Sequence, residues 1–438
     1  MSSPALCAHV PTDSEEPMMA VDFSLLPPEE PVPDNPPSRL FWTVAFFLIA
    51  TVGVFAVLLL WPKGESTQTL WFWTCLTVYP FGVAAFVVLR RYSVYAGRRL
   101  DAIAWNDARK DYVNGVFHQA GRPLAVLAAT FRFSFVAKED DFGKLLDGSV
   151  KLEPRLAPKP DAPPVSARWF EVLDIDGIPH KWDLGRQRHV LAWALGTVID
   201  MVGDAVRSLP LELKLKVQLV LPGIENVDDA LTVWNRQWAL ANIRVAQNGV
   251  LTEAPDLMYV DTWLERSNEG LDEEARLLVC VKLNAIHGAL PPDRSAEAVV
   301  AILLTPEAVS RRFNLSPVSM LHRPNGTRDC SIDDALARAM RWGCTQPAEV
   351  RRSWLGGVDT ANASAITKAV VKAGVDATPE NIDYMIGHAG EVAPWLAVAC
   401  AASAASIDRA PQLVITTDKA GGCFSVLRNF DMAKEGTK

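Results

Sequence analysis

Residues 40–61 read LFWTVAFFLIATVGVFAVLLLW, and residues 70–89 read LWFWTCLTVYPFGVAAFVVL. Neither run contains a charged side chain. A helix rises about 1.5 Å per residue, so each run is long enough to cross the hydrocarbon core of a bilayer. The link over residues 62–69 leaves room only for a tight turn. The two runs therefore predict a transmembrane helical hairpin over residues 40–89, with both ends of the chain on one side of the membrane.

The charges beside the hairpin predict its orientation. Four arginines lie within ten residues after the second run, whereas the turn contains one lysine, Lys63, beside Glu65. Positive charge near the end of a span stays on the cytoplasmic side, so both termini are predicted to be cytoplasmic. The alternatives are a buried helical pair in a soluble protein and a cleaved signal peptide. An acidic leader without a basic start argues against the signal peptide.

Composition limits the function of the remaining chain. The 438 residues leave room for one large domain or two small ones after the hairpin, and the net charge of -8 does not favour nucleic-acid binding. The seven cysteines form no CxxC pair, which is typical of reduced thiols and not of disulfides or structural zinc. No phosphate-binding glycine loop and no nucleophile elbow occurs, so we predict no cofactor.

Changes in composition divide the chain into six parts. Residues 1–39 are acidic and rich in proline, which predicts a disordered leader, either a plain solvated tail or a partner motif. Residues 90–151 follow the hairpin as a juxtamembrane helix, expected over 90–113, and a strand, expected over 124–136. Five prolines in residues 152–167 predict a semi-stiff linker and the main domain boundary. An α/β domain is expected over 168–430, with a tail over 431–438.

Hydrophobic periodicity in this domain alternates between helix and strand, which predicts a sheet with helices on both faces. We expect helices at residues 190–206, 226–239, 331–341, 363–373 and 393–406. We expect strands at residues 213–221, 257–262, 276–283, 298–304, 316–322, 382–386, 412–416 and 423–427.

Two further groups of residues in the domain have alternative interpretations. Carboxylates and a histidine near residue 180 could hold a cation, but Gly177 and Pro179 indicate an ordinary turn, so no metal site is predicted. The members of this group are Asp174, Asp176, His180 and Asp183. Six tryptophans are expected either in the core or, for a subset, on a docking face. They are Trp234, Trp238, Trp263, Trp342, Trp354 and Trp395.

The end of the chain resembles a known fold family. Residues 382–390 read IDYMIGHAG, a small-residue helix is expected over 393–406, and residues 411–428 read PQLVITTDKAGGCFSVLR. Residues 295–308, SAEAVVAILLTPEA, are similar to a mid-domain strand of the same family. The order of these segments and their residue types resemble those of β-ketoacyl synthases, which have the thiolase-like fold. The resemblance implies a thiolase-like layered α/β domain. It also implies a binding turn, formed by Gly387, His388, Gly390, Gly421 and Gly422.

The resemblance carries over little of the catalytic chemistry. In condensing enzymes a histidine in such a turn stabilises a thioester oxyanion, which points to His388. The nucleophilic cysteine of those enzymes follows a strand and opens a helix, where the helix N-terminus lowers the pKa of the thiol. No cysteine fits that position, and residues 234–238, where we would expect it, contain none. We therefore predict no catalytic residues; if the protein is an enzyme, the candidates are His388 and Cys330.

The whole arrangement resembles a second group of proteins. Residues 169–179 (WFEVLDIDGIP), 255–265 (PDLMYVDTWLE) and 386–399 (IGHAGEVAPWLAVA) are similar to accessory proteins of bacterial type VI secretion, such as the lipase adaptor family. That resemblance implies a non-catalytic adaptor, anchored in the bacterial inner membrane by two spans. It also implies a protein partner, either a secretion effector or another thiolase-like subunit, or a homodimer. The alternative function is a membrane-tethered β-ketoacyl synthase-like condensing or acyl-transfer enzyme.

Overall fold

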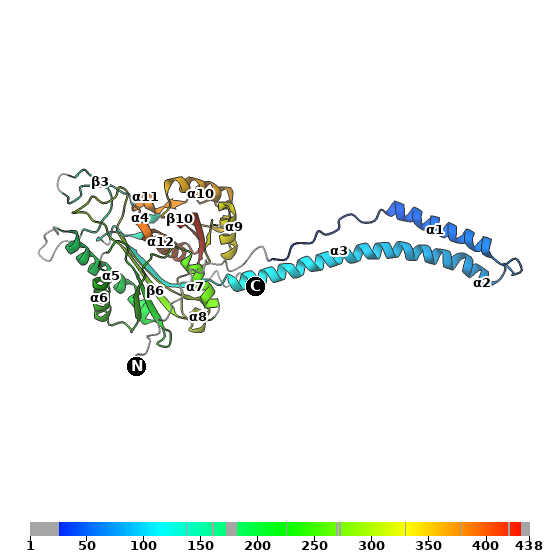
Figure 1. Cartoon of the computed structure of the whole chain (residues 1–438), viewed down its shortest axis with the longest axis horizontal. Coiled ribbons are helices and arrows are strands. Elements are labelled where there is room, and N and C mark those ends of the chain that lie inside the picture. Colours follow the sequence, from blue (N-terminus) through cyan, green and yellow to red (C-terminus); the bar gives the residue numbers. More distant parts are fainter. Residues whose placement is uncertain are drawn as a thin grey trace, which may run out of the picture. The chain divides into compact units, whose positions relative to one another are not determined.

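The computed structural model describes residues 26–430 apart from 137, 160–161, 172–181, 225, 269, 271–272, 329, 378 and 419–420. These residues form two compact units, a helical unit that ends at Phe117 and an α/β domain that begins at His118 (Figure 1). The predicted tail, residues 431–438, lies outside the described residues.

The helical unit contains the two predicted apolar runs. The first run forms α1, Arg39–Leu60. The second begins as α2, Leu70–Trp73, passes through a π-helical segment, η2 (Thr74–Val78), and continues as α3, Tyr79–Ala120. The helix predicted over residues 90–113 is therefore confirmed, but it is a continuation of the second run and not a separate element. Nothing in residues 70–120 breaks the helix, because no proline follows Pro80 before residue 123.

Pro80 explains the π-helical segment and the close packing of the two runs. Its ring crowds the carbonyl four residues earlier, and a widened turn relieves that clash. A Cβ added to Gly53 of α1 would lie 2.8 Å from the Cβ of Pro80, so only glycine permits this approach. Ala50, one turn before Gly53, and Ala84, one turn after Pro80, are both buried. The rings of Phe46 and Phe81 pack edge to face between the two runs.

The structure describes only the last part of the predicted leader. Residues 1–25 lie outside the described residues. Residues 26–38 are extended, and several of their carbonyls accept hydrogen bonds from side chains of α3. For these residues the prediction of disorder is wrong, because α3 supplies the contacts that an isolated proline-rich segment lacks.

Among the described residues, four helices are long and apolar enough to cross a membrane by length and composition. Two of them are the predicted spans, residues 39–60 and the helix that begins at Leu70. The other two, Asp183–Arg207 and Gly390–Asp408, lie inside the α/β domain, where their apolar windows are 50% and 72% buried. The corresponding window of α1 is 6% buried. Packing inside the domain accounts for the apolar character of the last two helices, whereas most of the apolar side chains of α1 are exposed in the described residues.

The domain is built on one eleven-stranded sheet, with strand order β11-β10-β12-β13-β8-β1-β7-β6-β4-β5 and β9 beside β13. Pairing is parallel at both ends of the sheet and antiparallel through its centre. The strands are β1 Leu124–Arg132, β4 Leu215–Val220, β5 Gln247–Val250, β6 Ala275–Lys282, β7 Ala298–Pro306, β8 Ser319–Leu321, β9 Asn325–Gly326, β10 Arg352–Gly356, β11 Glu380–Asn381, β12 Gln412–Asp418 and β13 Gly421–Arg428. A separate ribbon pairs β2, Pro154–Arg155, with β3, Val165–Ser166.

Helices cover both faces of this sheet, which confirms the predicted mixed α/β class. The helices are α4 Phe142–Leu146, α5 Asp183–Arg207, α6 Val227–Leu240, α7 Tyr259–Asn268, α8 Glu307–Arg312, α9 Ile332–Trp342, α10 Thr360–Lys372, α11 Ile382–Met385 and α12 Ala393–Asp408, with 3-10 turns at Pro347–Glu349 and Gly390–Val392. Figure 1 shows α12 in the middle of the domain, with α5 and α6 on one flank and α9 and α10 on the other.

Three core clusters fill the space between these layers. The inner cluster packs α12 and α7 against residues from both halves of the sheet, such as Val126 and Val414. On the outer face, α5 and α6 cover Ala125 and Leu127 in one half. In the other half, α9 and α10 cover Leu413 and neighbouring residues. Adjacent residues of β1 and of β12 therefore face different layers, as the two-residue period of a strand requires.

The domain boundary differs from the prediction. β1 lies before the proline-rich residues 152–167, yet it pairs with β7 and β8 in the middle of the sheet. The α/β domain therefore begins near residue 118 and not at 168. The β2–β3 ribbon lies within residues 152–167, of which 160–161 are not described. These residues therefore do not separate two domains.

Two predicted strands are helices. Residues 257–262 were expected as a strand but lead into α7, and the expected strand at 382–386 is replaced by α11, which ends at Met385. Both are short apolar runs, for which periodicity cannot separate a strand from a buried helical turn. The predicted helix starts at 226 and 331 are confirmed. Asn226 caps α6 by accepting the N–H of Asp229, and Ser331 caps α9 by accepting the N–H of Asp334.

Candidate functional site

The turn that carries His388 is fixed by its backbone. The N–H of His388 donates to the carbonyl of Arg294 at 2.6 Å, and the N–H of Ala296 donates to the carbonyl of His388 at 3.0 Å. Gly387 has a φ of +110°, and a Cβ there would lie 2.8 Å from the carbonyl oxygen of Ser295. Only glycine combines this conformation with such a close approach. The turn therefore lies directly against the segment that leads into β7.

The imidazole of His388 pairs with a carboxylate that sequence reasoning missed. Nδ1 of His388 lies 3.4 Å from the carboxylate of Asp383, and the same carboxylate accepts the N–H of Gly357 at 2.9 Å. The hydrogen bond that His388 donates to the carboxylate of Asp383 raises the pKa of His388, whereas burial and the positive charge of Lys282 act to lower it. The side chain of His388 is 53% exposed, so it is open to a reactant or a partner.

Lys282 completes the polar group around the turn. It is the last residue of β6. Gly390 has a φ of +58°, and a Cβ there would lie 3.6 Å from Cε of Lys282. The lysine stem therefore packs beside the turn that follows His388. Gly387, His388 and Gly390 thus lie in one turn, beside Lys282.

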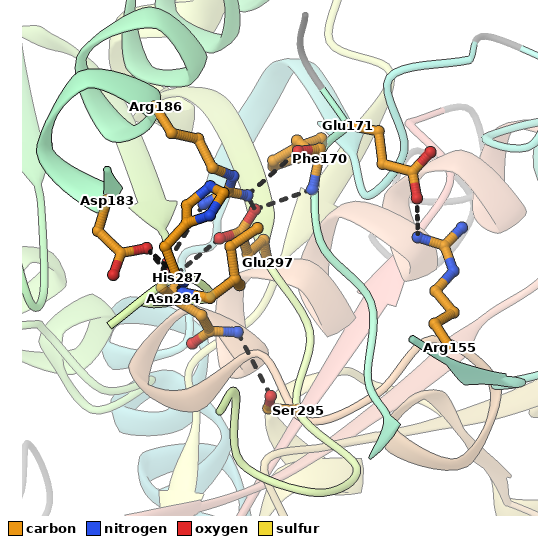
Figure 2. A network of polar contacts seen from close by, with 10 residues as sticks. Arg155, Phe170, Glu171, Asp183, Arg186, Asn284, His287, Ser295 and Glu297 are labelled. Carbon is orange, nitrogen blue, oxygen red and sulfur yellow. Dashed lines mark hydrogen bonds and ion pairs between the residues drawn. The ribbon is translucent and has the colours of Figure 1, made fainter. Parts of the chain in front are cut away.

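A buried ion pair supports the segment against which this turn lies (Figure 2). Nη2 of Arg186 in α5 contacts the carboxylate of Glu297 at 2.5 Å, and both side chains are almost fully buried. Glu297 also accepts the N–H of Phe170 at 2.8 Å and that of Asn284 at 2.7 Å. Arg186 donates to the carbonyls of the same two residues. These contacts fix four segments of the chain relative to one another, and Glu297 directly follows Ala296, the partner of His388.

A second carboxylate holds the neighbouring loop, as Figure 2 also shows. Asp183 accepts the N–H groups of Ile286 at 2.7 Å, His287 at 3.0 Å and Gly288 at 2.7 Å. Burial acts to raise the pKa of Asp183, but these donors together lower it. Asp183 therefore orders a loop. The other members of the group considered for a cation, Asp174, Asp176 and His180, lie outside the described residues.

Gly421 and Gly422 lie beside a different segment. The N–H of Thr327 donates to the carbonyl of Gly422 at 2.9 Å. A Cβ on Gly421, whose φ is +144°, would collide with the hydroxyl of Thr327. These two glycines are thus explained by the closing hairpin and by Thr327, and the described contacts do not join them to His388.

Cys330 lies near this hairpin and not near His388. Its thiol donates to the carbonyl of Gly326 at 3.5 Å, and Cys330 packs against the outer core cluster. Ile386 and Ala389, on either side of the His388 turn, belong to the inner cluster. The two candidate catalytic residues are thus associated with opposite faces of the sheet.

Of the other cysteines of the domain, Cys344 is exposed, and three are buried as structural residues. Cys280, Cys400 and Cys423 are fully buried in β6, α12 and β13. Burial raises the pKa of the thiols of Cys280 and Cys400, which keeps them protonated. Residues 234–238, where a nucleophile was sought, lie in α6 on the outer face of the sheet.

All six tryptophans considered for a docking face are buried. The exposed tryptophan of the domain in the described residues is Trp182, which is 77% exposed directly before α5. Leu184 follows it and is 54% exposed. Beside them lies an apolar groove of about 270 Å³ between α5 and α6, whose lining includes Leu184, Leu191 and Val233.

Sequence signals existed for some of the residues that were missed. Asp383 stands five residues before His388 in IDYMIGHAG, and Glu297 is the one charged residue in the largely apolar residues 295–306. A charge inside a buried strand needs a partner, which is the signal for the ion pair. Nothing near Glu297 in sequence indicates that Arg186 supplies it.

No family model matches the sequence, and no curated protein is similar to it. Structurally, the chain is similar to the ishigamide ketosynthase/chain length factor, with 12% identity and a TM-score of 0.45 over 70% of this chain and 99% of that one. An oxazolomycin ketosynthase domain from Streptomyces albus gives 13% and 0.44, covering 70% and 95%. The ketosynthase from module 6 of the Bacillus subtilis bacillaene synthase gives 13% and 0.48, covering 70% of each chain. Identities and TM-scores this low decide neither a family nor an activity.

Proposed function

We propose that this chain is a non-catalytic accessory protein of the bacterial inner membrane, whose cytoplasmic, thiolase-like domain binds a protein partner. The observation that carries the proposal is the placement of the thiols. Three cysteines of the domain are buried in the core, and Cys330 packs on the face of the sheet opposite to the cluster that contains Ile386 and Ala389. The exposed Cys344 lies two residues after α9, a helix of the same outer face. A condensing enzyme needs a thiolate and a histidine within hydrogen-bond reach of one substrate.

The contacts of the helical unit support the membrane topology in this proposal. Residues before α1 contact residues after the second run, for example through the Tyr92 hydroxyl and the carbonyl of Pro37 at 3.2 Å. These contacts support a topology in which both flanks of the hairpin lie on the same side of the membrane. The arginines after the second run favour the cytoplasm for that side.

The docking surface that we propose for the partner is the groove between α5 and α6 with its exposed neighbours. Trp182 and Leu184 offer large apolar surface at the edge of a concave apolar site. Aromatic side chains at such positions are the usual anchors of protein interfaces. The resemblance to type VI secretion accessory proteins suggests an effector protein as the partner, before its export.

Affinity capture from solubilised membranes tests this function. The wild-type chain, carrying a C-terminal tag, is expected to retain a partner that Leu184→Glu loses. Leu211→Glu is the matched control, because Leu211 is 85% exposed and does not line the groove. Equal recovery with both variants contradicts the docking surface. Recovery of no effector or secretion component by the wild-type chain contradicts the function itself.

Dimerisation is a separate part of the proposal. β5 is a terminal strand of the sheet in the described residues, so a second copy or another thiolase-like subunit could extend the sheet there. Light scattering of the detergent-solubilised chain at several concentrations measures this association. A mass of one chain at all concentrations argues against it.

The second candidate function is a membrane-tethered β-ketoacyl synthase-like condensing or acyl-transfer enzyme. The pairing of His388 with Asp383 favours it, because a half-exposed histidine held by a carboxylate can accept or donate a proton. This function predicts covalent labelling by an acyl thioester, lost in Cys330→Ala and preserved in Cys344→Ala. Absence of labelling in the intact chain rules out the cysteine-dependent reaction.

A further inference from the structure

Residues 27–37 lie along α3 as an extended, proline-rich strap. The hydroxyls of Tyr92 and Tyr95 donate to the carbonyls of Pro37 and Pro33, at 3.2 and 3.1 Å. Further along the helix, Nε1 of Trp105 donates to the carbonyl of Pro28 at 3.2 Å. The strap therefore runs antiparallel to α3, and the helix side chains act as donors to its backbone.

The lengths of the two segments agree with this pairing. A polyproline II chain rises about 3.1 Å per residue, so the ten steps from Pro27 to Pro37 cover about 31 Å. The seventeen steps of α3 from Tyr92 to Arg109 cover about 26 Å at 1.5 Å per residue. The reach of the terminal side chains accounts for the difference. A polyproline II chain has no internal hydrogen bonds, so its carbonyls are free to accept from the helix.

Two acidic residues fix the register of the strap. Nη1 of Arg109 lies 2.9 Å from the carboxylate of Glu29, and Nε of the same side chain donates to the carbonyl of Pro27. The side-chain amide of Asn106 both donates to the carbonyl of Glu30 at 2.9 Å and accepts its N–H at 3.0 Å. This reciprocal pair mimics the pairing of two strands. A strap shifted by one residue loses the ion pair between Glu29 and Arg109.

The side chains of α3 that meet the strap share one face of the helix. Tyr95, Ala102 and Arg109 are spaced by seven residues, and Asn106 follows Ala102 by four, so all four lie in one stripe. Ala102 is 4% exposed although its neighbours Asp101 and Ala104 are exposed. A small residue at this point allows the strap to approach the helix closely. The periodic pattern of burial is independent of the hydrogen bonds and marks the same face.

We propose that this face of α3, formed by Tyr92, Tyr95, Ala102, Trp105, Asn106 and Arg109, is a binding site for an acidic, proline-rich peptide. Its occupant in this chain is the chain's own strap, residues 27–37. Aromatic and amide donors aimed at proline carbonyls, with one arginine for an acidic residue, give the site both its affinity for polyproline II and its direction. The strap thus keeps the site closed to other proline-rich segments.

Disulfide trapping tests whether the strap belongs to the same chain. Glu30→Cys with Asn106→Cys is expected to form an intramolecular disulfide in the detergent-solubilised protein, because these residues are in direct contact. Glu30→Cys with Ala108→Cys is the matched control, since Ala108 is exposed and lies about 200° around the helix from Asn106. A disulfide-linked dimer assigns the strap to a second copy and overturns the proposal. Equal trapping of both pairs also overturns it.

Peptide binding tests the chemistry of the site. A labelled peptide of residues 26–38 is expected to bind a variant whose residues 27–37 are replaced by glycine and serine, and not the wild-type chain. Arg109→Glu in that variant is expected to weaken binding about tenfold, because it removes two contacts and reverses a charge. A peptide with Glu29→Lys should recover the loss. Lys110→Glu, an equal change at an exposed neighbour, should not weaken binding.

The peptide experiment has two outcomes that contradict the proposal. Failure of the peptide to bind the variant without its strap shows that the face is no peptide site. Equal binding to the wild-type chain shows that the strap does not occupy the site.

Discussion

α1 and α12 are both apolar enough to cross a membrane, yet their surroundings differ completely. The apolar window of α1 is 6% buried, whereas that of the segment containing α12 is 72% buried. The side chains explain the difference. α1 is built from large residues such as Phe47, Phe55 and Leu59, which are exposed. α12 has seven alanines among its sixteen residues, so the sheet can approach it from several sides.

The comparison shows that apolarity alone does not assign a helix to lipid. A helix surrounded by protein needs small side chains for close contact on every side, whereas large side chains can face lipid without a matching surface. The same contrast holds for polar contacts in the two units. The ion pair of Arg186 and Glu297 in the domain is almost fully buried, whereas Glu29 of the Arg109–Glu29 pair in the helical unit is 74% exposed.

The largest expected effect comes from placing the same charge in each helix. Ala401→Asp buries an unpaired carboxylate in α12, where Ala401 has no exposed surface, and should destabilise the domain by on the order of 4 kcal/mol. Ala56→Asp, at an exposed position of α1, should leave the domain folded but lower membrane insertion by about 3 kcal/mol. Tryptophan fluorescence during urea unfolding and alkaline extraction of membranes measure the two effects. An unchanged urea midpoint for Ala401→Asp contradicts the core position of α12.

A second contrast concerns two glutamates that each pair with an arginine. Glu297→Gln leaves Arg186 charged and buried without its carboxylate, which should cost about 3 kcal/mol of domain stability. Glu29→Gln removes the exposed partner of Arg109, and such pairs contribute less than about 1 kcal/mol. The urea midpoint of the domain should fall in the first variant and stay constant in the second. Similar midpoints for both would show that the buried pair is not a structural element.

Three glycines separate steric clash from backbone strain. Gly387→Ala combines a φ of +110° with a Cβ 2.8 Å from the backbone oxygen of Ser295, so it should cost about 2 kcal/mol. Gly374→Ala keeps a positive φ of +85° without a neighbour within 4 Å, and should cost only about 1 kcal/mol. Thermal unfolding of the domain ranks these two. Gly53→Ala should leave domain unfolding unchanged, because it acts on α1 and Pro80 in the helical unit. Equal losses for Gly387→Ala and Gly374→Ala would show that Ser295 does not crowd the turn.

The smallest effect is the titration of His388. Its pKa is raised in the folded chain, mainly by the hydrogen bond with Asp383. The pairing of protonated His388 with Asp383 therefore stabilises the folded domain fully below the ordinary pKa of histidine, about 6.5. This contribution to folding stability is lost as the pH rises through the pKa of His388 in the folded chain. NMR of labelled histidine, with His388→Gln to assign the signal, measures the midpoint. Asp383→Asn should lower it, and Lys282→Met should raise it.

Opposite shifts would contradict the assigned roles of Asp383 and Lys282. No change in either variant would show that His388 does not interact with them in solution.

Local signals in the sequence predicted much of the fold. Asn226 and Ser331 mark helix starts because their side chains cap the first turn, which requires only neighbouring residues. The strand β7 follows from its continuous apolar run. The short runs at 257–262 and 382–386 were assigned wrongly, because a few apolar residues fit a strand and a helical turn equally well.

The parts that sequence could not predict depend on distant partners. β1 belongs to the domain only because β7 and β8 pair with it, far along the chain. The proline-rich residues 27–37 are ordered only because α3 carries donors at matching spacing. In the site, His388 and its glycines were recognised from the local pattern, whereas Arg186 reaches Glu297 through a contact 111 residues apart.

The position of α12 in the chain also shapes how the protein is made. Its neighbours β1, β7 and β10 are synthesised before it, but β12 and β13 come after it. Under the proposed membrane topology, the ribosome has delivered α1 to the membrane before it releases α12, a further helix that is apolar enough to insert. Until β12 and β13 emerge, lipid and an unfinished core would then compete for α12. Under that topology, biogenesis of the protein requires the domain to enclose α12 faster than the membrane can take it up.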